Sequence, residues 1–226
     1  MRVPVNNRNS NDQAGPECPA LIRIKINMSQ VDPYYWFVQG RQYLIAAETL
    51  LDRIIKNGNQ LSYVGKPLKD KAIEKRLDSN DAYLFFPLML LFYHGIELFL
   101  KALYIIENGK RYKNDHEITS ILNAVDKNTD FKVIVDEVKK YTYFLDKNFP
   151  EFHQWLTLNK FTIDSFYLFL RYPSTTIGKR PGIEIFQIEV LGLETKTLPH
   201  YRKLRAAIRS IIKGGVIVLR KHKGVK

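Results

Sequence analysis

Two residues with complementary chemistry, Arg111 and His116, lie five positions apart near the middle of the chain. A histidine can act as a general acid or base because it gains and loses a proton near neutral pH. An arginine can stabilise negative charge that develops on a phosphate. A polar residue at a helix start also commonly makes a capping or interhelical hydrogen bond. The chemistry of the pair is therefore compatible with work on a phosphate, and a structural tie between a loop and a helix is the alternative for His116.

A second group of polar side chains interrupts the apolar stretch at 82–106. His94, Glu97 and Lys101 are spaced by three and four residues, so an α-helix places them on one face. Glu97 and Lys101 could form a surface ion pair, but the apolar residues around them favour burial, and a buried pair needs further partners. The candidate partners are His116, at a predicted helix start, and Arg171, just before Tyr172. The prediction is therefore a constellation of four residues around one groove: Glu97, Lys101, His116 and Arg171. The constellation is either a structural network or a ligand site.

The carboxyl-terminal part concentrates positive charge. Residues 195–226 contain ten Lys and Arg and no Asp or Glu, in a chain with a formal net charge of +12. A helix places four of these residues in one stripe opposite the isoleucines: Arg202, Arg205, Arg209 and Lys213. Such a stripe suits the phosphates of RNA or another polyanion, with salt-sensitive binding that is mostly independent of base sequence. The alternative is a solvated helix face.

Helices must position these side chains, since helical periodicity dominates from residue 32 to residue 213. The pattern predicts helices at about 34–56, 82–106, 115–125, 130–147, 152–158, 162–170 and 199–213, with Gly214-Gly215 ending the last. Two segments alternate as strands do, and we expect them to pair: 21–28 and 183–190. The predicted fold is mainly α, an up-and-down bundle of four to five helices with a small peripheral β element. We expect a tail that can include a short strand at 1–31, a helical domain at 32–213 and a basic tail at 214–226.

Composition narrows the class of protein. The single cysteine, Cys18, cannot form an internal disulfide and excludes a cysteine-based zinc site. Neither metal-ligand spacings nor phosphate-binding glycine loops occur, so we predict no metal and no cofactor. The 82–106 stretch is long enough to span a membrane, but Glu97 and Lys101 would each cost roughly 2.5–3.5 kcal/mol there. Because the amino terminus also lacks an apolar signal segment, we predict a cytoplasmic protein without a membrane partner.

Three short motifs, in this order, resemble the HEPN superfamily of helical bundles. They are HGIELFLKALYI with Glu97 and Lys101, DHEITSIL with His116, and SFYLFLRYPS with Arg171, Tyr172 and Pro173. The resemblance spans about 34–213 and implies a bundle of four or five helices that is often dimeric. It also implies an association with RNA or nucleotides, often in toxin–antitoxin or defence systems with a nucleotidyltransferase or antitoxin as partner. Many members are metal-independent ribonucleases with an Arg-x4-6-His motif, which Arg111 and His116 match between the second and third main predicted helices.

Together these observations predict a HEPN-like protein associated with RNA or nucleotides, and they leave ribonuclease activity open. The predicted catalytic residues are Arg111 and His116. The predicted binding residues are Glu97, Lys101, Arg171, Tyr172, Arg202, Arg205, Arg209 and Lys213. The alternative is a non-catalytic helical module for dimerisation or protein interaction. We expect a homodimer, with RNA or another polyanion as its partner.

Overall fold

The computed structural model of the chain describes residues 32–58, 82–113, 116–172 and 194–223. These residues form eight α-helices and one 3-10 helix, and none of them is in a strand. The elements are α1 (Pro33–Asn57), α3 (Ala82–Asn108), α4 (Ile118–Val125), η1 (Thr129–Phe131), α5 (Lys132–Lys140), α6 (Leu145–Asn148), α7 (Pro150–Leu158), α8 (Ile163–Arg171) and α9 (Glu194–His222). The prediction of a mainly α helical bundle is confirmed. The predicted strands at 21–28 and 183–190 lie outside the described residues.

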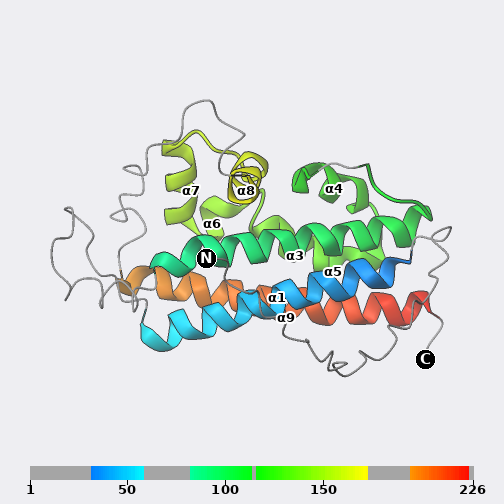
Figure 1. The fold of residues 1–226 in the computed structure, drawn as a ribbon, viewed down its shortest axis with the longest axis horizontal. Coiled ribbons are helices and arrows are strands. Elements are labelled where there is room, and N and C mark those ends of the chain that lie inside the picture. Colours follow the sequence, from blue (N-terminus) through cyan, green and yellow to red (C-terminus); the bar gives the residue numbers. More distant parts are fainter. Residues whose placement is uncertain (1–31, 59–81, 114–115, 173–193, 224–226) are drawn as a thin grey trace, which may run out of the picture. The chain divides into compact units, whose positions relative to one another are not determined.

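The described helices belong to one compact unit, Val31–Lys226. Helix α3 packs against α1, α4, α8 and α9, while α9 also packs against α1 and α5 (Figure 1). Helix α3 is apolar around most of its circumference, because it contributes core side chains toward all of these neighbours. It is therefore the element that carries the polar group of His94, Glu97 and Lys101 into the centre of the bundle.

Local chemistry sets both ends of α1. The Asp32 carboxylate accepts a hydrogen bond from the Tyr34 amide at 2.8 Å, and Pro33 occupies the first turn, where no backbone donor is needed. Gly58 ends the helix at φ 76°, a left-handed conformation that glycine adopts without a steric penalty. The predicted limits of this helix are confirmed to within one residue.

Two glycines let α1 and α3 cross at close range. A Cβ atom on Gly40 would lie 2.6 Å from Cδ2 of Phe99 and 2.9 Å from the carbonyl oxygen of Gly95. The close approach places two aromatic side chains of α1 against the polar group on α3. The Trp36 ring lies 5.6 Å from Nζ of Lys101, and the Tyr43 ring lies 4.4 Å from the ring of His94.

The prediction of one helix over 130–147 was wrong, because the chain turns at 141–144. Helix α5 ends at Lys140, and α6 begins at Leu145. The buried Tyr93 hydroxyl donates a hydrogen bond to the carbonyl oxygen of Tyr141 at 2.9 Å. That carbonyl is thereby satisfied by a side chain of α3 and needs no partner in a continuing helix.

The prediction that Gly214-Gly215 end the last helix was also wrong. Helix α9 continues through both glycines to His222, and the segment predicted as a tail buries Val218 and Leu219. A glycine inside a helix costs about 1 kcal/mol relative to alanine. Here the missing side chain of Gly215 leaves room for the rings of Phe37 and Phe99, so close packing offsets the cost.

We expect Gly215→Ala to lower the free energy of unfolding by about 1–3 kcal/mol, because overpacking displaces buried rings. The added Cβ atom would lie 2.2 Å from Cε2 of Phe37 and 2.6 Å from Cε1 of Phe99. The matched variant Gly214→Ala meets Cγ1 of Ile134 at 2.9 Å, which a small shift relieves, and it should cost less. Urea unfolding followed by circular dichroism measures both, and equal stabilities would contradict the packing argument.

Candidate functional site

A single buried carboxylate, Glu97 on α3, organises the polar side chains of the bundle. The residue is only 1% exposed. Its Oε1 atom accepts a hydrogen bond from Nζ of Lys101 at 2.6 Å and lies 2.8 Å from Nδ1 of His116. Lys101 comes from the next turn of α3, whereas His116 comes from the segment that leads into α4.

The second carboxylate oxygen of Glu97 faces α8. The Tyr167 hydroxyl donates a short hydrogen bond to Oε2, and Nη1 of Arg171 donates a second at 3.2 Å. Nδ1 of His94 lies 3.3 Å from the same oxygen. Tyr167 and Arg171 are four residues apart, so α8 presents both to the carboxylate on one face. We refer to these six residues as the Glu97 cluster: His94, Glu97, Lys101, His116, Tyr167 and Arg171.

The surroundings of Glu97 keep it ionised. Burial raises the pKa of a carboxyl group, but hydrogen bonds from His94, Lys101, Tyr167 and His116 oppose this, and they hold the pKa of Glu97 well below its ordinary value. The pKa of the Tyr167 phenol lies well above its ordinary value, first because of burial and then because of the negative charge of Glu97. At neutral pH the cluster therefore contains a carboxylate and a phenol that keeps its proton.

The position of the proton on the His116 ring selects the partner of Nδ1. Nδ1 of His116 lies 2.6 Å from Nη1 of Arg171 and 2.8 Å from Oε1 of Glu97. Arginine can only donate, so an unprotonated Nδ1 accepts from Arg171, whereas a protonated Nδ1 donates to Glu97. Nδ1 of His94 meets the Tyr167 hydroxyl oxygen at 2.6 Å. Because the Tyr167 proton points to Glu97, Nδ1 of His94 is assigned as the donor in that contact.

Positive charge exceeds negative charge in the Glu97 cluster, and Arg171 carries one of the positive charges on its outer side. Lys101 and Arg171 carry two positive charges against the one negative charge of Glu97, before either histidine is protonated. Glu97 and Lys101 are buried, while the side chains of His116 and Arg171 are 36% and 19% exposed. An approaching ligand would therefore meet an imidazole and a guanidinium, a pair suited to phosphate oxygens.

Aromatic rings surround the same polar group. The guanidinium of Arg171 lies 5.5 Å from the ring centre of Tyr167 and 5.2 Å from that of Tyr172. The Tyr172 hydroxyl accepts a hydrogen bond from Nη2 of Arg171 at 3.3 Å. Trp36 and Tyr43 approach from α1, as described above. The rings of Tyr167 and Tyr172 hold the Arg171 guanidinium in place, and aromatic rings are also suited to stacking on a flat ligand.

The structure brings together the four residues that the sequence analysis placed around one groove: Glu97, Lys101, His116 and Arg171. Arg111 is exposed in the segment that follows α3. No hydrogen bond or ion pair joins Arg111 to His116 among the described residues. The arginine that meets His116 is Arg171, which lies 55 residues further along the chain.

The predicted basic stripe on α9 divides into paired and solvent-facing residues. Nη1 of Arg205 lies 2.6 Å from Oδ1 of Asp52, and Nε of Arg209 lies 2.5 Å from Oε1 of Glu48. Both acids belong to α1, so this part of the stripe fastens α9 to α1. Arg202 and Lys213 are exposed.

The sequence analysis missed Tyr167 as a site residue. It stands in the run SFYLFL, which reads as core, and it is indeed buried. Its position four residues before Arg171 is the signal that could have found it, because that spacing places both side chains on one helical face.

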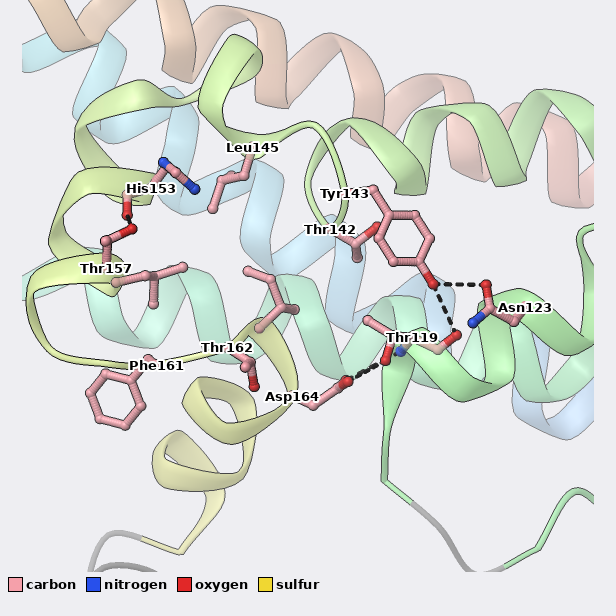
Figure 2. A pocket seen from close by; sticks show the side chains of 12 residues that line it. Thr119, Asn123, Thr142, Tyr143, Leu145, His153, Thr157, Phe161, Thr162 and Asp164 are labelled. Carbon is pink, nitrogen blue, oxygen red and sulfur yellow. Dashed lines mark hydrogen bonds between the residues drawn. The ribbon is translucent and has the colours of Figure 1, made fainter.

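A separate hollow of about 500 Å³ lies between the start of α8, helix α7 and the segment around Tyr143 (Figure 2). The amide of Thr119 donates to Oδ1 of Asp164 at 3.2 Å, and the Thr119 hydroxyl makes a short hydrogen bond to Oδ2. The Tyr143 hydroxyl donates to Oδ1 of Asn123 at 2.8 Å. None of the predicted site residues lines this hollow, and its polar groups mainly tie α4 to its neighbours.

Across the described ranges, no group of three or more His, Cys, Asp or Glu side chains is arranged to hold a metal ion. The segment Leu84–Asn108 of α3 is long and apolar enough to cross a membrane by length and composition, and 72% of its most apolar window is buried inside the bundle. The core helix of a bundle has the same properties.

We expect Glu97→Gln to lower the free energy of unfolding at neutral pH by roughly 3–5 kcal/mol, because it leaves buried cationic groups without their counter-charge. The matched control is Glu137→Gln. The Glu137 carboxylate accepts from Nζ of Lys140 at 2.8 Å in a more exposed pair, so its loss should cost less than about 1 kcal/mol. Urea unfolding compares the two variants, and equal losses would contradict a central role for Glu97.

The same charge predicts a dependence on pH. The pKa of Glu97 is lower in the folded chain than its ordinary value of 4.5, so the unfolded chain takes up the proton first as the pH falls. This share of the stability is complete above about pH 4.5 and is lost progressively below it. Glu97→Gln lacks this contribution, so the difference in free energy of unfolding between wild type and variant should become smaller as the pH falls below about 4.5. Parallel stability curves in urea titrations at several pH values would contradict this.

The chain matches no protein-family model, no curated protein and no solved structure. The HEPN resemblance of the motifs around Glu97, His116 and Arg171 therefore stays a prediction from the sequence.

Proposed function

We propose that the chain is a HEPN-like helical protein that binds RNA or another nucleotide-bearing partner, with the Glu97 cluster as its phosphate-contacting site. The observation that carries the proposal is the contact of His116 with Arg171 at 2.6 Å beside a buried carboxylate. The two groups come from distant parts of the chain and form the outer side of a cluster with surplus positive charge. Glu97 and Tyr167 position them and do not themselves contact the ligand.

The proposed binding mode follows from the chemistry of these groups. The guanidinium of Arg171 can share its donors between Glu97 and a phosphate oxygen, because it carries five N–H groups. His116 adds a further donor when it is protonated. The rings of Trp36, Tyr43 and Tyr172 are suited to contact a base or sugar beside that phosphate. Lys101 is buried, and we assign it to neutralising Glu97.

Ribonuclease activity is the catalytic form of this proposal. His116 would act as general acid or base. A guanidinium would stabilise the negative charge that develops on the phosphate, and Arg171 in the cluster or the exposed Arg111 could supply it. The toxin–antitoxin or defence setting, the cytoplasmic location and a nucleotidyltransferase or antitoxin partner follow from the family resemblance alone. They belong to the proposal on that basis.

The test is the binding and cleavage of a short labelled single-stranded RNA in the presence of EDTA. We expect Arg171→Gln and His116→Gln each to weaken binding roughly tenfold, the effect of losing one charge-assisted hydrogen bond. The matched control Lys160→Gln removes an exposed charge between α7 and α8 and should bind like the wild type. If the wild type cleaves the RNA, His116→Ala should abolish cleavage. Arg111→Ala should also abolish it if the arginine of the Arg-x4-His motif is catalytic. Binding by the two cluster variants equal to that of the control would refute this site.

A non-catalytic interaction module is the second candidate, and exposed apolar side chains favour it. Tyr35 and Ile45 on α1 and Ile217 on α9 are 53%, 40% and 58% exposed. A homodimer, which the family resemblance implies, could cover such side chains. Light scattering coupled to gel filtration measures the mass of the protein. If a dimer uses this surface, Ile45→Ser with Ile217→Ser should convert it to a monomer, whereas the exposed pair Val133→Ser with Leu158→Ser should not.

A further inference from the structure

Helices α1 and α9 pack along a line that we call the α1–α9 seam. On α1, Tyr34, Arg41, Glu48 and Asp52 are spaced by seven, seven and four residues and therefore share one helical face. That face lies against α9, because Glu48 and Asp52 form ion pairs with Arg209 and Arg205, and Tyr34 contacts Lys223.

On α9 and the residue that follows it, the seam carries a row of basic side chains. Arg205, Arg209, Lys213, Arg220 and Lys223 are separated by four, four, seven and three residues, so they share one helical face, with Val216 between Lys213 and Arg220. Arg205, Arg209 and Lys223 are in contact with α1, which places Lys213 and Arg220 along the same line. Lys221 points elsewhere, to Asp130 at 2.7 Å.

Negative charge balances only one half of this seam. The two ion pairs lie in the half formed by the end of α1 and the middle of α9. In the other half, residues 33–47 of α1, residues 210–222 of α9 and the following Lys223 contain no Asp or Glu. Asp32 precedes α1 and caps it through the Tyr34 amide. Among the described residues, the ion pairs do not include Arg41, Lys213 or Arg220, and all three are exposed.

Exposed aromatic rings lie at the end of the unbalanced half. Tyr34 and Tyr35 are 44% and 53% exposed, and their rings meet edge to face with centres 6.5 Å apart. Nζ of Lys223 lies 4.1 Å from the ring centre of Tyr34. Cationic side chains in a row that ends in exposed tyrosines are what proteins use to bind single-stranded nucleic acids, since phosphates follow the charges and unpaired bases stack on the rings.

We propose that the unbalanced half of the α1–α9 seam binds single-stranded nucleic acid, with the backbone along Arg41, Lys213 and Arg220 and a base on Tyr35. The inference rests on the proposed function and adds a binding surface outside the Glu97 cluster. An acidic protein segment would satisfy the charges but would leave the rings unexplained. A duplex would satisfy the phosphates, but its paired bases could not stack on Tyr35.

The first experiment measures binding of a short labelled single-stranded RNA by fluorescence anisotropy at several salt concentrations. We expect Lys213→Gln with Arg220→Gln to weaken binding roughly tenfold and to reduce the salt slope by about 1.4, as two lost phosphate contacts on a single strand should do. The control, Lys127→Gln with Lys160→Gln, removes the same charge from exposed positions that lie on neither α1 nor α9. Circular dichroism verifies that both double variants are folded.

The second experiment tests the tyrosine. Tyr35→Ser should weaken binding of the single strand roughly tenfold and leave binding of the matching duplex unchanged. Equal affinity of the seam variant and its control, or equal effects of Tyr35→Ser on single strand and duplex, overturns the inference. If the wild type binds no RNA, the proposed function fails as well. If the wild type binds RNA and only the Arg171 and His116 variants weaken it, this inference fails alone.

Discussion

A carboxylate taken out of water must be compensated by hydrogen bonds and opposite charge, and this requirement determines the arrangement around Glu97. Its two oxygens face Lys101, His116, Tyr167, Arg171 and His94, which come from α3, α8 and the segment before α4. No one of these elements could satisfy the carboxylate alone. The charge therefore specifies how α8 and the α4 segment sit on α3, and in doing so it holds His116 and Arg171 at the outer side of the bundle.

The close crossing of α1 and α3 completes that arrangement. Gly40 and Gly95 let the two helices approach until the rings of Trp36 and Tyr43 lie on Lys101 and His94. Helix α3 therefore carries both apolar side chains that pack in the core and the charged residues of the Glu97 cluster. Hydrophobic burial supplies the stability of such a bundle, while the polar network supplies a preference for one register of the helices.

The basic residues of α9 have two different roles. Arg205 and Arg209 meet acids of α1 and act as structural contacts, although the sequence presents them in the same stripe as Lys213. Composition alone could not separate them, because Glu48 and Asp52 lie more than 150 residues away in the chain. Where the acids of α1 stop, the stripe continues without counter-charge, and this change along a single helix motivates the proposed nucleic-acid surface.

The sequence by itself determined what depends on local periodicity. The mainly helical class, the limits of α1 and the shared face of His94, Glu97 and Lys101 follow from spacings of three to four residues and from capping chemistry. It also suggested His116 and Arg171 as partners of Glu97, through a family resemblance. Only the tertiary structure decided that Arg171 meets His116, that Tyr167 closes the network, that Tyr93 accompanies the break after α5, and that α9 continues through Gly214-Gly215. Each of these depends on atoms brought together from distant parts of the chain, and local preferences carry no information about such contacts.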